Sequence, residues 1–360
     1  MNYTEDKLRA FLSTNGHVVL EKTGGDYILR SFTEQEIGEI TFGYRILLGK
    51  GAFGEVYRGI LESKRPVAVK RYINGTRKEE FAREVIVHSQ INHKNVVRLL
   101  GCCTEENALM IVMEFICNGN LEDFLHCKNG SCLIPLPLHK RLDIAIGSAE
   151  VLAYMHSMYC PALHGDIKPA NILLDENLVP KISDFGIARL LSADEIQHTS
   201  SIIGCRGYVD PIYCQSGVFN PKSDVYSFGV VLLELITWKT AKYSCNGKAR
   251  VLVRDFLEAY RTDGSVMAIF DEEDYRIHDR LFLQKASTIA VECLQLDITK
   301  RPNIRDILSR LQIIAADHSC RSKPSGKTTE IFEIKSAIFF RNFIQPDVDP
   351  YMLIGLDKIS

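Results

Sequence analysis

Long hydrophobic runs are missing from this chain of 360 residues. A membrane-spanning helix needs about 20 consecutive apolar residues. The apolar segment Val225–Ile236 is too short for this and contains Ser227 and Glu234. The start, Met1-Asn2-Tyr3, has neither a secretory signal nor the glycine that myristoylation requires. The sequence therefore predicts a protein without an intrinsic membrane span.

An excess of charge of one sign is also missing. The 43 Lys and Arg residues nearly balance the 45 Asp and Glu residues, so the net charge of −2 gives no reason to expect nucleic acid or an acidic membrane as a partner. Paired C-x-x-C spacings are absent as well, although the chain has 11 cysteines. An odd number without such pairs predicts reduced thiols rather than a disulfide framework. We interpret Cys102-Cys103 as small buried hydrophobic residues rather than metal ligands.

A glycine-rich segment, Gly49-Lys50-Gly51-Ala52-Phe53-Gly54, lies between two strand-like runs. Glycines allow backbone N–H groups to approach phosphates closely. The G-x-G-x-x-G of dinucleotide-binding folds would open onto a helix, whereas Glu55-Val56-Tyr57-Arg58 continues as a strand. The segment is not a G-x-x-x-x-G-K-[ST] loop either. We therefore predict a hairpin that covers nucleotide phosphates.

A lysine follows at the end of the next predicted strand, in Val67-Ala68-Val69-Lys70. Beside such a hairpin, Lys70 is predicted to hold the α- and β-phosphates, and it needs a carboxylate to orient it. Glu84, within a helix predicted over Arg77–Ile91, is the candidate. Glu79 and Glu80 are the alternatives, but they precede Phe81 and are expected to face solvent.

The segment His164–Asn171 reads H-G-D-I-K-P-A-N, and Asp184-Phe185-Gly186 follows 13 residues after Asn171. This set of residue types suits phosphoryl transfer, which needs a general base, a phosphate clamp and two Mg²⁺ ligands at one point. Asp166 is predicted to accept or orient the substrate hydroxyl, and Lys168 to stabilise the γ-phosphate. Asn171 and Asp184 are predicted to hold Mg²⁺ through oxygen atoms, which suit a hard cation.

Together these motifs resemble the eukaryotic protein kinase family over residues 42–316. Asp224, in Lys222-Ser223-Asp224-Val225-Tyr226, matches the family's central-helix aspartate. The finer resemblance is to plant receptor-like kinases of the wall-associated group. It is carried by the phrases Ser89–Cys103 and Gly207–Pro211, and the leader Phe11–Leu20 is similar to the juxtamembrane segment of that group.

The resemblance implies an α+β, bilobal protein kinase fold, with a small β-rich N-lobe that has one key helix and a larger, mainly helical C-lobe. The implied parts are a leader (1–41), the N-lobe (42–113), a hinge (114–120), the C-lobe (121–316) and a tail of unknown role (317–360). Apolar spacing predicts helices over Leu138–His156, Leu281–Leu296 and Ile304–Ile314. A buried central helix over Ser223–Trp238 is predicted to be capped by Ser223, and Thr33–Glu36 reads as a capping box.

The resemblance also implies the ATP site. Met113 would be the gatekeeper and Glu114–Ile116 the hinge, with Val56 and Ala68 above the adenine and Leu173 below it. The residues expected to contact ATP are Leu48, Gly49, Lys50, Gly51, Ala52, Phe53, Gly54, Val56, Ala68, Lys70, Met113, Glu114, Phe115, Ile116 and Leu173.

The implied function is that of a serine/threonine protein kinase that uses ATP and Mg²⁺ in plant receptor-like or defence signalling. The expected partners are a protein substrate and a receptor or immune complex. The expected location is the cytoplasm, or the plasma membrane through such a partner.

Four positions depart from the family pattern. Gly165 replaces the Arg that usually precedes the catalytic Asp, which removes the main receptor for a phosphate on residues Thr199–Ser201. Cys205 replaces a Thr that hydrogen-bonds the catalytic Asp and Lys. Ile212 replaces a Glu that pairs with a buried Arg, here Arg301, and His88 replaces an apolar residue of the internal hydrophobic stack. A second function therefore stays open: a pseudokinase or weakly active kinase that serves as a scaffold or decoy binding module.

Overall fold

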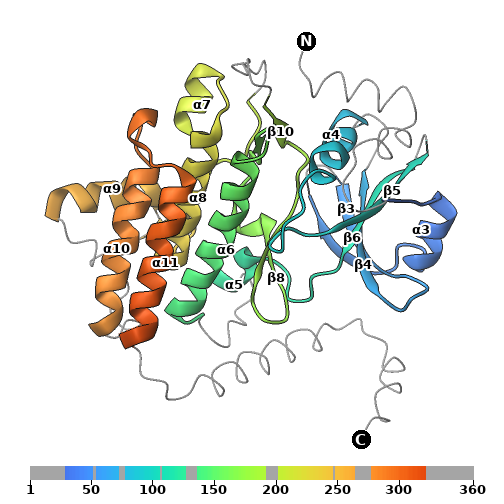
Figure 1. Cartoon of the computed structure of the whole chain (residues 1–360), viewed down its shortest axis with the longest axis horizontal. Coiled ribbons are helices and arrows are strands. Elements are labelled where there is room, and N and C mark those ends of the chain that lie inside the picture. Colours follow the sequence, from blue (N-terminus) through green and yellow to red (C-terminus); the bar gives the residue numbers. More distant parts are fainter. Residues whose placement is uncertain are drawn as a thin grey trace, which may run out of the picture.

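The computed structural model describes residues 29–51, 54–72, 78–105, 108–126, 136–191, 202–245, 248–263 and 277–321. A β-sheet with short helices beside it lies at one end of the molecule, and a helical lobe lies at the other (Figure 1). This is the α+β arrangement that the sequence predicted. The leader phrase Phe11–Leu20, Ala52, Phe53 and the hydroxyls of residues 199–201 fall outside the described residues.

Six strands form the sheet, in the order β1-β5-β6-β4-β3-β2. They are β1 (Arg30–Ser31), β2 (Leu47–Lys50), β3 (Gly54–Ile60), β4 (Pro66–Tyr72), β5 (Leu99–Glu105) and β6 (Ala108–Glu114). Strands β2 to β6 pair antiparallel, and β1 pairs parallel to β5. Gly54 must be glycine, because an added Cβ would lie 2.1 Å from the Arg71 carbonyl oxygen. The β2–β3 hairpin that the glycine-rich segment predicted is present.

The leader contributes to the sheet lobe through β1 and helix α3 (Glu34–Ile40). Thr33 caps α3, and its side chain and that of Glu36 form the reciprocal capping box that the sequence predicted. Phe32 and Ile37 are buried against the outer face of the sheet, in one cluster with Val69 and Met110. The polypeptide is therefore packed into the core of this lobe from about residue 30 onward.

Helix α4 (Lys78–His88) lies beside the sheet (Figure 1) and presents Phe81, Glu84 and Val85 as buried residues. It lies within the helix predicted over Arg77–Ile91. The chain then passes from β6 into the helical lobe through Phe115 and Ile116.

The helical lobe contains seven described helices. They are α5 (Leu121–His126), α6 (Leu138–His156), α7 (Pro211–Ser216), α8 (Pro221–Thr237), α9 (Leu252–Asp263), α10 (Ile277–Cys293) and α11 (Ile304–Arg321). Its short strands are β7 (Ala162–Leu163), β8 (Ile172–Leu174), β9 (Pro180–Ile182), β10 (Arg189–Leu190), β11 (Lys242–Cys245) and β12 (Lys248–Val251). Short 3₁₀ turns span Pro169–Asn171 and Ile298–Lys300. No helix within the described ranges is long and apolar enough to cross a membrane.

Helix α8 runs through the middle of this lobe between α6 and α10 (Figure 1), and almost all of its residues are buried. The prediction of a buried central helix is confirmed, but the predicted cap is wrong. Asn220 caps the helix by accepting a hydrogen bond from the Lys222 amide, and Ser223 lies inside the first turn. The physical reason is Pro221, whose fixed φ and missing N–H favour the first helical position.

Candidate active site

Lys70 contacts one acidic side chain from each lobe. Its Nζ lies 2.7 Å from Glu84 Oε2 and 2.7 Å from Asp184 Oδ1. Lys70 comes from β4 and Glu84 from α4, whereas Asp184 follows β9 in the helical lobe. Glu84 is fully buried while Glu79 is exposed, so the structure brings together the pair that the sequence favoured.

Burial and charge oppose each other in this cluster. Burial would lower the pKa of Lys70, but Asp184 and Glu84 outweigh it and raise that pKa above its ordinary value. Burial likewise opposes ionisation of Asp184, yet Lys70 holds the pKa of that carboxyl below its usual range. Burial raises the pKa of Glu84, although Lys70 acts against it. Two carboxylates face one ammonium, so the ionised cluster keeps an excess negative charge.

A second polar cluster surrounds Asp166, which is largely buried. Lys168 donates to its Oδ2 at 2.5 Å, and the Asn171 amide nitrogen donates to the same oxygen at 2.9 Å and to the Asp166 carbonyl at 2.8 Å. Burial opposes the charge on Lys168, but Asp166 raises the pKa of that ammonium. Because Asn171 uses its amide nitrogen here, its amide oxygen is the atom that can act as a metal ligand.

Helix α8 fixes the loop that carries Asp166. The Asp224 carboxylate accepts hydrogen bonds from the backbone amides of His164 at 3.0 Å and Gly165 at 2.9 Å, and its Oδ2 lies 2.9 Å from His156 Nε2. Burial opposes ionisation of Asp224, but the hydrogen bond from His156 and the Gly165 amide hold its pKa below the ordinary value. The buried Asp224 carboxylate, which accepts three hydrogen bonds, therefore holds this loop in place.

The two clusters bring two carboxylates, two ammonium groups and an amide together from both lobes. Residues 43–311 match the family model described as protein tyrosine and serine/threonine kinase. This chain belongs to the protein kinase family.

The curated relatives include wall-associated receptor kinases of Arabidopsis thaliana. Wall-associated receptor kinase 5 is 39% identical over 86% of this chain and 43% of its own length. Wall-associated receptor kinase 2 is 40% identical over 86% of this chain and 43% of its own length. Wall-associated receptor kinase-like 16 is 39% identical over 85% of this chain and 72% of its own length. The kinase thus spans less than half the length of the first two relatives.

The residues expected to contact adenine come from both lobes of the kinase. Ala68 on β4 pairs with Met113 on β6. The Glu114 amide donates a hydrogen bond to the Arg98 carbonyl oxygen at 2.9 Å, so it is not available to adenine. Leu173 is on β8, across the connection from the sheet. Leu48, Gly49 and Lys50 lie in the exposed strand β2, followed by Gly51, and Val56 lies on β3. Their contact with a nucleotide stays a prediction.

His88 takes part in an aromatic stack between the lobes. Its ring centroid lies 4.6 Å from that of Phe185, which in turn lies 5.0 Å from that of His164. Burial lowers the pKa of His88 to about 4, so the ring is neutral at pH 7, and its Nε2 lies 2.5 Å from the Val97 carbonyl oxygen. A polar ring thus occupies an apolar position of the family pattern. Glu84, one turn earlier on α4, contacts Lys70 in its presence.

Gly165, which replaces an arginine of the family, has a φ of +82°, a region that glycine adopts without strain. A small hollow lies beside it, lined by Arg83, Ile187, Arg189, Ile203, Tyr213 and Phe219. Arg189 lines this hollow, whereas Arg206, the other arginine nearby in the sequence, is exposed and does not. Sequence reasoning missed Arg83, which only the fold brings here from α4.

Cys205 lies near the Asp166–Lys168 pair and is half-buried. Burial raises the pKa of the thiol, while the nearby Lys168 acts to lower it. Among the described residues the thiol has no hydrogen-bond partner, in contrast to the threonine that it replaces. The Asp166–Lys168 contact forms without its help.

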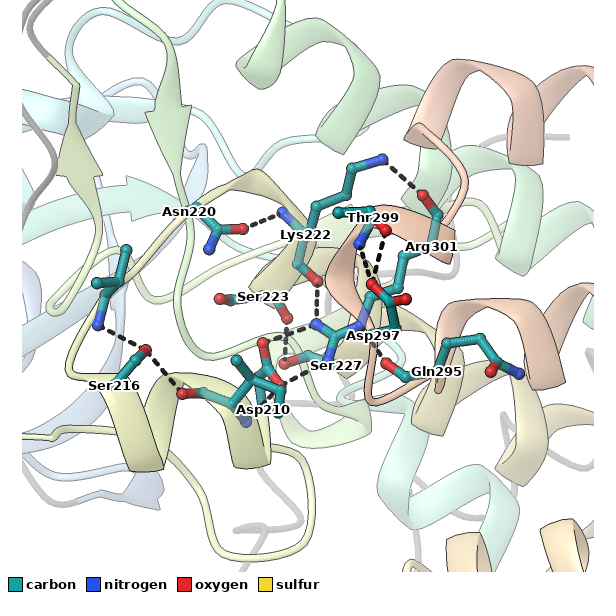
Figure 2. A network of polar contacts seen from close by, with 12 residues as sticks. Asp210, Ser216, Asn220, Lys222, Ser223, Ser227, Gln295, Asp297, Thr299 and Arg301 are labelled. Atoms are coloured by element: carbon teal, nitrogen blue, oxygen red, sulfur yellow. Dashed lines mark hydrogen bonds and ion pairs between the residues drawn. The ribbon is translucent and has the colours of Figure 1, made fainter.

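Arg301 has another carboxylate as its partner, although Ile212 replaces the glutamate of the family pattern. Its guanidinium donates to Asp210 Oδ2 at 2.7 Å and Oδ1 at 2.8 Å, and also to the carbonyls of Gln295 at 2.7 Å and Lys222 at 2.9 Å. Figure 2 shows Asp210 and Arg301 pointing toward each other inside this network. Asp210, two residues before Ile212, supplies this carboxylate because its side chain turns inward from the start of α7.

Proposed function

We propose that this chain is an active serine/threonine protein kinase that transfers the γ-phosphate of Mg-ATP to hydroxyl groups of proteins. The observation that carries the proposal is Lys70, whose Nζ contacts Glu84 and Asp184 at 2.7 Å each. An ammonium oriented by one buried carboxylate and adjoining a second, partly exposed carboxylate is suited to bind phosphates beside a metal.

The residues present fit a Mg²⁺ ion. The Asp184 side chain is 27% exposed, so it can reach a ligand, and the Lys70 cluster carries excess negative charge. The Asn171 amide oxygen supplies a second hard ligand. Bound there, Mg²⁺ would neutralise charge on the phosphates. The assigned residues are therefore Asp184 and Asn171 for the metal.

Asp166 is the proposed base, which accepts the proton of the attacking hydroxyl or orients it. Its Oδ2 is held by Lys168 and Asn171, so the side chain has one fixed orientation. Lys168 is the group that would turn from Asp166 to the transferring phosphoryl group and stabilise its charge. Lys70 would hold the other phosphates under the β2–β3 hairpin.

Turnover is tested with purified protein, Mg-ATP and a generic acceptor protein such as casein. We expect phosphate incorporation that Asp166→Asn reduces by at least about a hundredfold, because that variant lacks the proton acceptor. Asp143→Asn, an exposed carboxylate on α6, is the matched control and should leave the rate unchanged. Absence of incorporation in the wild type at all acceptor concentrations would refute the proposal.

Metal dependence is tested separately by thermal shift. ATP should raise the melting temperature more with Mg²⁺ than with EDTA, and Asp184→Asn should remove that difference. An equal shift under both conditions would show that Asp184 and Asn171 do not hold a metal with the nucleotide.

The second candidate, a pseudokinase or weakly active kinase that serves as a scaffold or decoy, is favoured by one observation. Cys205 makes no hydrogen bond to Asp166 or Lys168 within the described residues, and such a bond contributes about 1 kcal/mol. Cys205→Thr distinguishes the two functions. A several-fold gain in turnover indicates a weakened active kinase, whereas no turnover in either protein favours the scaffold.

We further propose that the chain acts in plant receptor-like or defence signalling, in the cytoplasm or at the plasma membrane through a receptor partner. The support is the description of its relatives as receptor kinases. Cell fractionation with and without such a receptor tests the location.

A further inference from the structure

Tyr72 lies at the end of β4, two residues after Lys70. Residues two apart on a strand point to the same side of the sheet, and here both side chains face α4. The Tyr72 hydroxyl donates a hydrogen bond to Glu84 Oε2, the same oxygen that lies 2.7 Å from Lys70 Nζ. The phenol and the ammonium therefore converge on one carboxylate oxygen.

Glu84 depends on those two donors. Its side chain is completely buried, and its other oxygen, Oε1, has no hydrogen-bond partner among the described residues. A buried carboxylate is costly unless it is paired and hydrogen-bonded. Lys70 is shared with Asp184, so it cannot serve Glu84 alone. Tyr72 supplies the only other hydrogen bond that the described residues give this carboxylate.

The Tyr72 ring is held in place independently of its hydroxyl. It packs edge-on against Phe81 of α4, with ring centroids 5.4 Å apart at an interplanar angle of 85°, and only 6% of the residue is exposed. The Lys70 ammonium lies 5.3 Å from the same ring. Burial, together with Glu84, raises the pKa of Tyr72 well above its usual value, so the phenol remains a donor at neutral pH.

We propose that Tyr72 is a positioning residue for nucleotide binding and phosphoryl transfer. Its hydroxyl holds Glu84 in the orientation that pairs with Lys70, and its ring joins β4 to α4 at that point. The inference rests on the proposed kinase function, and it adds a residue outside the motifs that predicted the site. Without the hydroxyl, Glu84 would lose one of two donors and Lys70 would be drawn toward Asp184.

Tyr72→Phe tests this, because it keeps the ring and its contact with Phe81 while removing one hydroxyl. We expect kcat/KM for Mg-ATP to fall by about tenfold or more, the range for losing a hydrogen bond to a charged group, with KM for the acceptor protein unchanged. Tyr243→Phe is the matched control. Its hydroxyl also donates to a carboxylate, Asp255 Oδ2 at 2.8 Å, but it joins β11 to α9 in the helical lobe and contacts neither Lys70 nor Glu84, so its kinetics should equal those of the wild type.

A double-mutant cycle separates positioning from general packing. In a Glu84→Ala background, Tyr72→Phe should cause less than about a twofold further change in Mg-ATP affinity or turnover. An equal loss in both backgrounds would overturn the inference, and so would unchanged Mg-ATP kinetics in the single variant.

Measuring nucleotide affinity distinguishes a failure of this inference from a failure of the proposed kinase function. A wild type that binds Mg-ATP without turnover would refute kinase activity, and the cycle measured on the dissociation constant would still decide the role of Tyr72. A wild type that neither binds nor turns over Mg-ATP would overturn both.

Discussion

Asp210 binds Arg301 through both carboxylate oxygens, at 2.7 and 2.8 Å, and the two side chains are 1% and 0% exposed. The same Asp210 Oδ1 accepts the Ile212 amide at 2.9 Å and so caps α7. One carboxylate thus begins a helix and neutralises a buried guanidinium. It connects the start of α7 to the turn that precedes α11 (Figure 2).

Asp210→Asn should destabilise the kinase by about 3–5 kcal/mol, because it leaves Arg301 buried without its counter-charge. Asparagine caps helices as well as aspartate does, so the loss reports the ion pair rather than the cap. Asp297→Asn is the control, since Asp297 also caps a turn but pairs with Lys300 at the surface. Urea unfolding should show little change for the control. Equal losses in the two variants would mean that the buried ion pair contributes no more to stability than the surface pair.

Ile212→Glu should not raise the melting temperature. The substitution restores the family's glutamate opposite Arg301, but Asp210 already satisfies that guanidinium. A second carboxylate would add a negative charge next to that of Asp210, without a further donor to bind it. In an Asp210→Asn background the same substitution should recover part of the lost stability. A gain in the otherwise unchanged protein would show that Arg301 still lacks an acceptor.

The Asp210–Arg301 pair shows which contacts a sequence pattern cannot predict. Lys70, Asp166 and Asp184 could be predicted because each lies in a short motif whose spacing reflects local structure, and Glu84 because helical periodicity separates it from the exposed start of its helix. Asp210 and Arg301 are 91 residues apart, and no local pattern says which acidic residue near α7 turns inward.

Two further residues escaped prediction for related reasons. Tyr72 carries no signature on a strand, since an aromatic residue there reads equally well as core. Asn220 and Ser223 are both capping types, and only the preference of Pro221 for the first helical turn distinguishes them.

Lys70→Met should remove turnover and should also reduce stability by up to about 3 kcal/mol at neutral pH, because Glu84 loses its ammonium. The pKa of Glu84 is already raised by burial in the folded protein, and loss of Lys70 raises it further. The folded variant then binds more protons than the unfolded chain above pH 4.5, so its stability falls as pH rises.

The difference in the free energy of unfolding between this variant and the wild type should therefore increase from pH 5 to pH 8, as measured by urea unfolding. Lys94→Met, which removes a surface partner of Glu150, serves as the control and should show only a small loss of stability across this range. A difference for Lys70→Met that stays constant with pH would mean that Glu84 does not change its protonation.

His88→Leu should reduce the sensitivity of the fold to acid. The folded pKa of His88 is about 4 and its ordinary value is 6.5, so the unfolded state binds more protons between those limits. Stability is therefore lost as pH falls from 6.5 toward 4, by up to about 1.4 kcal/mol per pH unit from this one group. The variant should lack that slope, which unfolding curves at pH 4.5, 5.5 and 6.5 measure. His164 is present in both proteins, so the difference isolates His88. Identical slopes would contradict the assignment.

Replacing the hydroxyls of residues 199–201 by alanine should lower the rate on an exogenous substrate by less than about tenfold, or roughly 1.4 kcal/mol of transition-state stabilisation. A phosphate there orders a loop only when guanidinium groups receive it, and Gly165 removes the family's main one. Arg83 and Arg189 line the hollow beside Gly165 and are the groups that could compensate. Arg83→Ala should therefore have the same small effect in the wild type and in the triple-alanine variant. A loss above tenfold in the triple variant, abolished when Arg83 is already alanine, would show instead that phosphorylation controls this kinase through the arginine that α4 contributes.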